Sequence, residues 1–183
     1  MNQSHSSQKN RRGFSLIELL VVISIIVILA GIGLAAFSKV KKSQAIDLTK
    51  VRIKDATLKL EVYANENNGL YPVGDDASSS ILYNALSGDY TGNGSNPTGP
   101  TYWKELLNKD PSLVGTLDGK KVILDAFGQS LRYRAARDEN GEIVPDVKND
   151  GSFDIWSVGP DGKPTDINVD GNTVNDDTKD DIW

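Results

Sequence analysis

Residues 13–37 read GFSLIELLVVISIIVILAGIGLAAF, and this stretch decides the fold. Between residues 14 and 37, Glu18 is the only charged side chain. As a helix, this run would be roughly 36 Å long at about 1.5 Å per residue, enough to cross a hydrocarbon core of about 30 Å. In lipid, a single segment can satisfy all of its backbone hydrogen-bonding groups only as a helix. The run therefore predicts a membrane-spanning helix despite its many β-branched residues.

A short, polar and basic segment precedes this apolar run. Lys9, Arg11 and Arg12 mark its end of the chain as cytoplasmic, because positive charges favour that side of a membrane. A secretory signal peptide is the alternative, but its apolar region spans only about 7–15 residues and precedes the cleavage site. Here the expected processing site, Gly13, comes before the apolar run. Cleavage there would remove residues 1–13 as a leader peptide and leave the helix on the mature protein.

Glu18 stands inside the apolar run, where an ionised carboxylate costs roughly 2.5–3.5 kcal/mol at mid-membrane. One interpretation is an acid that is tolerated near the membrane interface. The other is a pairing group. If the chain is cut after Gly13, Phe14 carries a free α-amino group, and Glu18 of one subunit would neutralise the Phe14 amine of its neighbour. Such a pair would set the axial register of a filament.

Residues 13–22 resemble the prepilin processing motif of type IV pilins and type II secretion pseudopilins. The motif is a glycine, then a phenylalanine, then a glutamate four residues later, all ahead of an unbroken apolar helix. The resemblance implies cleavage between Gly13 and Phe14 by a prepilin peptidase and N-methylation of Phe14. It also implies assembly through the N-terminal helix, in which Phe14 and Glu18 take part.

Composition excludes several classes of site. The chain has 183 residues and no cysteine, so it has neither disulfides, thiol catalysis nor cysteine-based zinc sites. The only histidine, His5, lies in the predicted leader. A membrane-anchored enzyme is a further alternative, but no general base or nucleophile pair stands out, and we expect no enzymatic activity. The net charge is −5, and the acidic C-terminal end would repel nucleic acid.

Beyond the apolar run, the sequence predicts a continuing helix and a small globular domain. Residues 38–68 form an amphipathic spine, which ends at a stop signal before the domain of residues 69–183. The expected buried stripe comprises Ala45, Leu48, Arg52, Ala56, Leu60 and Tyr63, widened by Val51, Leu58 and Val62. The expected short helices are 81–86 and 102–108, and the expected strands are 121–124, 130–134 and 153–158.

These elements predict an α+β fold in which the long N-terminal helix packs against a small antiparallel β-sheet. A turn at Gly128 joins the first two strands. The three tryptophans, Trp103, Trp156 and Trp183, are interpreted as core or helix contacts.

Four segments of the chain resemble the G-type major pseudopilin of type II secretion, which has a type IV pilin-like fold. They are residues 69–72, 125–134, 153–162 and 180–183. In that family the middle block usually reads Asp-Pro-Trp-Gly, where this chain has Ala126 and Phe127. The resemblance implies a structural subunit that assembles into the periplasmic pseudopilus and drives protein export across the outer membrane.

The implied location is the bacterial inner membrane, with a single pass over residues 14–37 and the C-terminal domain in the periplasm. The implied partners are further copies of the chain, minor pseudopilins, the inner-membrane secretion machinery, the prepilin peptidase and, before assembly, membrane lipid. No nucleic acid is expected. The alternative is a type IV or competence-type pilin that serves adhesion, motility or DNA uptake.

The same resemblance implies one bound calcium ion that stabilises the C-terminal loop. Calcium takes six to eight oxygen ligands. Carried over by position, these would be the Ser157 hydroxyl, the Val158 carbonyl and the carboxylates of Asp161 and Asp181, with Asp180 as a further candidate. The alternative is a solvated acidic tail.

A second calcium pattern lies within that loop. Residues 166–171 read DINVDG and match the opening of an EF-hand loop, with an aspartate at the twelfth position. No amphipathic helices flank it, so the candidate is a helix-free calcium loop with Asp166, Asn168, Asp170 and Asp177 as ligands. An Asx-rich turn is the alternative.

Overall fold

The computed structural model describes residues 14–73, 79–92, 94, 97–108, 110–138, 140–144, 147–149, 151–162 and 182, with the backbone alone for 32–36 and 161. The predicted leader, residues 1–13, therefore lies outside the described residues. The chain divides into two compact units, Met1–Lys41 and Lys42–Trp183.

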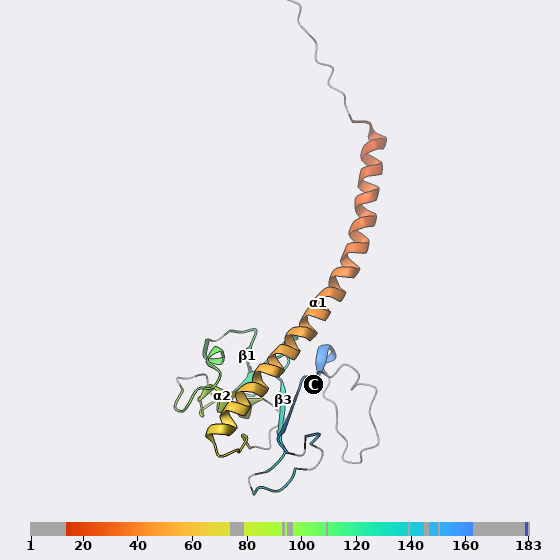
Figure 1. Cartoon of the computed structure of the whole chain (residues 1–183). Coiled ribbons are helices and arrows are strands. Elements are labelled where there is room, and N and C mark those ends of the chain that lie inside the picture. The colour runs from red at the N-terminus through yellow and green to blue at the C-terminus, as the bar shows by residue number, and fades with distance from the viewer. Residues whose placement is uncertain are drawn as a thin grey trace, which may run out of the picture. The chain divides into compact units, whose positions relative to one another are not determined.

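One helix, α1 (Leu16–Glu66), belongs to both units (Figure 1). It ends at the predicted stop. Asn68 and Gly69 have positive φ angles of 58° and 80°, and the Gly69 amide donates to the Ala64 carbonyl at 2.7 Å. This left-handed turn satisfies a carbonyl that the helix end would otherwise leave open.

In the part of the chain that the structure describes, no helix is both long and apolar enough to span a membrane.

The second unit adds short helices and strands to the C-terminal part of α1. They are α2 (Ser80–Ser87), the 3-10 helices η1 (Lys104–Asn108) and η2 (Gly159–Asp161), and the strands β1 (Val114–Leu117), β2 (Lys120–Ile123), β3 (Arg132–Ala135) and β4 (Phe153–Trp156). The α+β class is thus confirmed. The single predicted sheet is wrong in detail, because the described strands form two antiparallel pairs, β1–β2 and β3–β4.

The pairing follows from the turns. In β1–β2, Val114 lies opposite Ile123 across a two-residue turn whose residues, Asp118 and Gly119, both have positive φ angles of 49° and 79°. Such a turn matches the twist of a hairpin, and Asp-Gly is its preferred sequence. Strand β1 was not predicted, although Asp118-Gly119 is a sequence signal for this hairpin.

The predicted turn at Gly128 is confirmed, with a φ angle of 84°. An isolated antiparallel bridge between Leu124 and Ser130 closes it and joins β2 to β3. In β3–β4, Arg132 lies opposite Trp156. The two strand pairs are therefore linked by one short turn.

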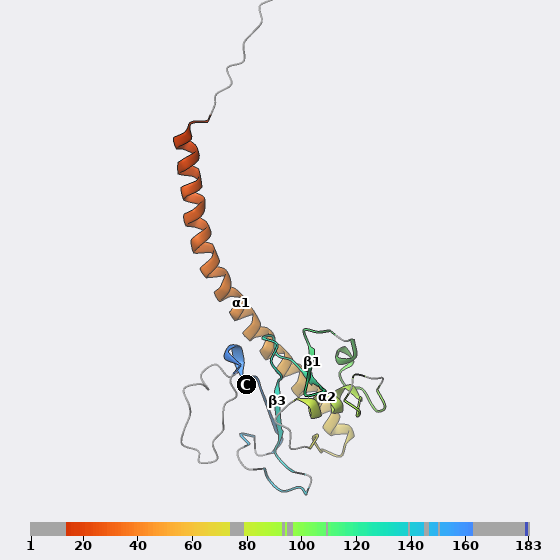
Figure 2. The same ribbon diagram turned by 180° about the vertical axis from the view of Figure 1, so that it is seen from behind.

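The core lies between the C-terminal part of α1, α2 and the strands. Figures 1 and 2 show the orange-to-yellow turns of α1 lying across the strands in both views. The buried cluster includes Ala56, Leu60, Leu82, Leu86, Ile123, Leu131, Tyr133 and Ile155. Trp103 and Trp156 are buried as predicted, and Trp183 lies outside the described residues.

The predicted stripe on α1 is partly wrong. Ala56 and Leu60 are buried, but Leu48, Val51, Leu58 and Val62 are 46–54% exposed. They recur at spacings of three, seven and four residues and therefore lie along a different face from the one that packs on the domain. Apolar residues occupy two faces of this helix, and periodicity alone does not decide which one the domain covers.

Candidate functional site

The described chain begins at the predicted processing site. Helix α1 starts at Leu16, and the amide of Ser15 donates a 2.9 Å hydrogen bond to Glu18 Oε2. Ser15 and Glu18 thus occupy the positions of a capping box, in which a glutamate three residues on satisfies a free amide at the helix start. This bond gives Glu18 a role in its own chain. The sequence analysis missed that role, although the S-x-x-E spacing is its signal.

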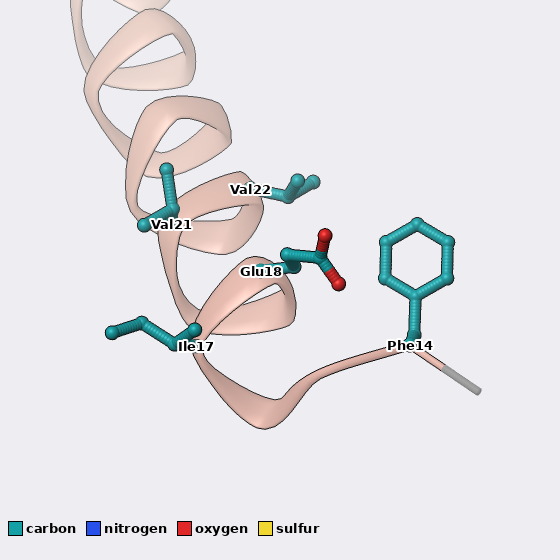
Figure 3. A pocket seen from close by; sticks show the side chains of 5 residues that line it. All are labelled: Phe14, Ile17, Glu18, Val21 and Val22. Carbon is teal, nitrogen blue, oxygen red and sulfur yellow. The ribbon is translucent and has the colours of Figure 1, made fainter. Parts of the chain in front are cut away.

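Figure 3 shows the surroundings of Glu18. Phe14, Ile17, Glu18, Val21 and Val22 line a shallow hollow at this end of α1. The Glu18 carboxylate lies on the same side of the first turn as the Phe14 ring, which is 81% exposed. The structure therefore brings together Phe14 and Glu18, the two predicted assembly residues, while the glycine of the processing site precedes the described residues.

Little of the predicted calcium site is described. Ser157 and Val158 have described side chains, and Asp161 contributes only its backbone, in η2. Asp180 and Asp181 lie outside the described residues, and so do Asp166, Asn168, Asp170 and Asp177 of the predicted second site. Across the described ranges, no three His, Cys, Asp or Glu residues are grouped in a way that could hold a metal ion. Both calcium sites therefore stay predictions.

Ser157 is fully buried where β4 ends. Its backbone pairs with Ile182, through hydrogen bonds of 2.9 and 3.0 Å between the two residues. Its hydroxyl donates to Asp125 Oδ2 at 2.6 Å and accepts from the Gly159 amide at 3.0 Å. The chain then turns through η2, which Gly162 closes with a φ angle of 67°.

Asp125 is a buried carboxylate that the sequence analysis did not single out. Its Oδ1 accepts hydrogen bonds of 2.8 Å from the amides of Phe127 and Gln129, and its Oδ2 accepts from the Ser157 hydroxyl. Asp125 thereby fixes the turn around Gly128 and ties it to the end of β4. The sequence does carry a signal for this role: an aspartate at the start of a tight turn commonly accepts a hydrogen bond from the backbone amide two residues later.

Two polar residues of α1 hold the same turn from the other side. Thr49 Oγ1 accepts from the Ala126 amide at 3.1 Å. Arg52 Nη1 donates to the carbonyls of Ser112, Leu124 and Asp125 at 2.8, 3.0 and 2.7 Å. Thr49 and Arg52 are thus buried on the domain-facing side of the helix because their polar atoms have partners.

Burial of the Arg52 guanidinium lowers its pKa, because it removes the charged form from water. The negative charges of Asp110 and Asp125 act in the opposite direction and raise the pKa. Arg52 is therefore a buried charge whose desolvation is offset by carbonyl oxygens and two nearby acids.

A second buried acid organises the loop after α2. Asp89 accepts from the Thr91 amide at 3.2 Å, from the Thr91 hydroxyl and from the Gly94 amide at 2.7 Å. Burial opposes ionisation of Asp89, but these hydrogen bonds outweigh it and lower the pKa of Asp89 below its ordinary value of 3.8. The carboxylate is therefore a structural anchor for this loop.

Residues 8–34 match the family described as the prokaryotic N-terminal methylation motif, which places the chain in the class of pilin-like proteins with this N-terminus. The chain is also 30% identical over 156 residues to the type II secretion system core protein G of Pseudomonas aeruginosa, a match that covers 85% of this chain and 88% of that relative. The chain therefore belongs to the family of type II secretion core protein G, the major pseudopilins. No solved structure is significantly similar to it.

Family membership confirms the resemblance inferred from the sequence. It makes the chain a pseudopilin subunit with a structural role, and it gives no support to the alternative of an adhesion, motility or DNA-uptake pilin.

Proposed function

We propose that the chain is cleaved between Gly13 and Phe14, is held in the inner membrane by residues 14–37, and then polymerises through α1 into a periplasmic pseudopilus that drives protein export. The proposal includes N-methylation of Phe14 by the prepilin peptidase, and assembly with minor pseudopilins and the inner-membrane secretion machinery. The methylation motif and the similarity to core protein G support it.

This proposal rests mainly on the exposure of the apolar side chains of α1. Every large apolar side chain between residues 14 and 29 is exposed in the single chain, with Leu16 at 87% and Val27 at 70%. A helix that is apolar on all sides is stable only when lipid or protein covers it. Membrane lipid before assembly and neighbouring helices afterwards would supply that cover in turn.

The second unit has an exposed apolar stripe of its own on α1. Leu48, Val51, Leu58 and Val62 are exposed along one side of α1, separately from the face that packs on the domain. We infer that further copies of the chain cover this stripe, because its spacings of three, seven and four residues are those of a helix–helix seam. The second unit would then contribute its own contacts to assembly through the stripe from Leu48 to Val62.

Glu18 supplies the register of the filament in this proposal. Its carboxylate would neutralise the α-amino group of Phe14 on a neighbouring subunit, which removes the cost of a lone charge in an apolar environment. The Ser15 amide already occupies one carboxylate oxygen and holds the side chain toward the helix end. A pre-positioned carboxylate loses less conformational entropy when it pairs.

Two substitutions separate pairing from capping. Glu18→Gln keeps an oxygen for the Ser15 amide but removes the charge, whereas Glu18→Ala removes both. Both variants should insert into the membrane and fail to form pseudopili, as judged by immunoblots of membrane and sheared fractions. Lys50→Gln, which also removes a charge but at an exposed position outside the proposed contacts, should still assemble. Normal pseudopili from Glu18→Gln would contradict the charge pair.

We also propose that one calcium ion binds at the end of β4, held by Ser157, Val158, Asp161 and Asp181, with Asp180 as a further ligand. Two features support this. The two hydrogen bonds of the Ser157 hydroxyl leave one of its lone pairs for a further partner. Ile182, which directly follows Asp180 and Asp181 in the sequence, pairs with Ser157. The oxygen donors suit calcium, which would supply a positive charge that organises the acidic loop.

Calcium binding would appear directly as stability, because an ion that binds only the folded chain stabilises it by about 2.7 kcal/mol at 100 times its Kd. The full chain in detergent should unfold at a higher temperature with CaCl2 than with EGTA, and Asp161→Ala should abolish the difference. Equal unfolding temperatures with and without calcium would exclude the site.

A further inference from the structure

The exposed apolar stripe on the second unit of α1 has a charge at its centre. Asp55 is exposed, and it lies four residues after Val51 and three before Leu58, which puts it on the same side of the helix. With Asp55 included, the stripe follows a heptad repeat. Leu48, Asp55 and Val62 occupy its a positions, and Val51 and Leu58 occupy its d positions.

An aspartate at an a position opposes one particular way of pairing two copies. When parallel helices pair at the same level, each a residue faces the same residue of its partner. Two stripes that met at one level would therefore bury Asp55 against Asp55 of the other copy. Both carboxylates would lose water and repel each other, and neither would offset the desolvation of the other.

The charges that flank the stripe act in the same direction. In a parallel pair, a g residue of one helix lies beside the next e residue of its partner. Lys54 and Glu61 are g residues of this repeat, and Lys59 and Glu66 are e residues. All four side chains reach solvent. Pairing at one level would place Lys54 beside Lys59 of the neighbour, and Glu61 beside Glu66, so both contacts would join like charges.

A displacement of one heptad reverses these contacts. If Asp55 of one copy lies opposite Val62 of its neighbour, each g residue meets the e residue one heptad further on. Lys54 then lies beside Glu66 of the neighbour. Asp47, which is an exposed g residue, lies beside Lys59 of the neighbour. Both contacts join opposite charges, and Asp55 no longer faces a second Asp55.

We propose that Asp55 and the charges beside the stripe prevent two copies from pairing stripe to stripe at one level, and that the stripe contacts a neighbour displaced by one heptad. The inference rests on the proposed polymerisation through α1. In the displaced contact, the g side of one copy meets the e side of the next, so the contact repeats from copy to copy without closing. A level pair would use the same surface on both copies and would end at two subunits. Asp55 thereby keeps unassembled copies from closing into dimers.

Introduced cysteines can measure the displacement, because the chain has no cysteine of its own. Val51→Cys alone reports stripes that meet at one level, and so does Leu58→Cys alone. The two substitutions in one chain also report a displacement of one heptad, which brings position 51 opposite position 58. Within one helix these positions are about 10.5 Å apart, too far for a disulfide. In cells that assemble pseudopili, mild oxidation should give a ladder of multimers from the double variant and little dimer from either single variant.

Substitution of Asp55 tests the barrier itself. In the Val51→Cys chain, Asp55→Leu should raise the amount of crosslinked dimer at least about tenfold, because it removes the like charges from the level pair. Asp55→Glu keeps the charge and should leave the amount of dimer low.

Charge exchange tests the displaced contact. In the double-cysteine chain, Lys54→Glu should reduce the ladder roughly threefold, and adding Glu66→Lys should restore it. Lys50→Glu makes the same change of charge outside the stripe and is the matched control, with an unchanged ladder.

The outcomes separate this inference from the proposed function. A strong dimer from Val51→Cys with Asp55 in place would overturn the inference, and so would a dimer that does not increase with Asp55→Leu. Pseudopili from the unmodified chain without a ladder from the double variant would overturn it while leaving the proposed function intact. If the unmodified chain formed no pseudopili, the proposed function itself would fail. Should Asp55→Leu not fold, the comparison of the single and double cysteine variants decides, because it leaves Asp55 unchanged.

Discussion

Arg52 offers the sharpest test of how the helix holds the domain. Its guanidinium is buried and donates through Nη1 to three carbonyl oxygens, two in the segments around β1 and β2 and one in the Asp125 turn. Arg52→Met has a similar length and no charge, so it removes these bonds while filling most of the space. Lys54→Met makes a matched change on the exposed side of the same helix.

The expected cost follows from the carbonyls that remain. The Asp125 carbonyl keeps a hydrogen bond from the Gly128 amide at 3.3 Å, whereas the carbonyls of Ser112 and Leu124 lose a charged donor. Bonds to charged donors contribute about 1.5–3 kcal/mol each, and removing a buried charge returns part of its desolvation cost. The net destabilisation should be about 2–4 kcal/mol, which lowers the Tm of a domain of this size by about 6–12 °C.

Near-UV circular dichroism of the full chain in detergent, followed on heating, measures this effect. Lys54→Met should change the stability by no more than about 0.5 kcal/mol. The role assigned to Arg52 would be refuted if Arg52→Met unfolded within about 3 °C of Lys54→Met, a margin of about 1 kcal/mol.

Three further predictions concern other parts of the second unit. Because the pKa of Asp89 is lowered in the folded chain, its contribution to stability is fully present above pH 3.8 and is lost as the pH falls below 3.8 through the pKa of the folded state. A titration of the free energy of unfolding against pH should show this loss. Asp89→Asn should make that free energy less dependent on pH in the same range. Tyr133→Phe should cost about 1–2 kcal/mol in denaturant unfolding, because the buried hydroxyl donates to the Pro72 carbonyl at 2.8 Å; an unchanged midpoint would contradict this. Val51→Glu should block pseudopilus formation without lowering Tm, whereas Lys50→Glu, outside the apolar stripe, should still assemble. If both variants assembled, the apolar stripe would be excluded as an interface.

The sequence predicted the N-terminal motif correctly. The spacing of its glycine, phenylalanine and glutamate indicated a pilin-like protein, and the methylation-motif family matches residues 8–34; such a motif is a local pattern that needs no tertiary context. The capping bond from the Ser15 amide to Glu18 was not predicted, although the S-x-x-E spacing of this same stretch indicates it.

The domain was harder to predict. The stop at Asn68 and the turn at Gly128 were confirmed because positive φ angles favour Asn and Gly locally. Strand β4 was predicted, but not that its Asp154 is buried; the carboxylate of Asp154 accepts hydrogen bonds from the amides of Lys148 and Asn149. A hydrogen-bond partner six residues away in the chain is not visible in a hydrophobic pattern.

By itself, the sequence determined the N-terminal motif and the α+β class, because these depend on local residue order and on hydrophobic periodicity. Only the tertiary structure decided which face of α1 the domain covers, and that Thr49, Arg52, Asp125 and Ser157 meet beneath it. A polar residue is buried when partners from distant segments satisfy it, and those partners are brought together only by folding.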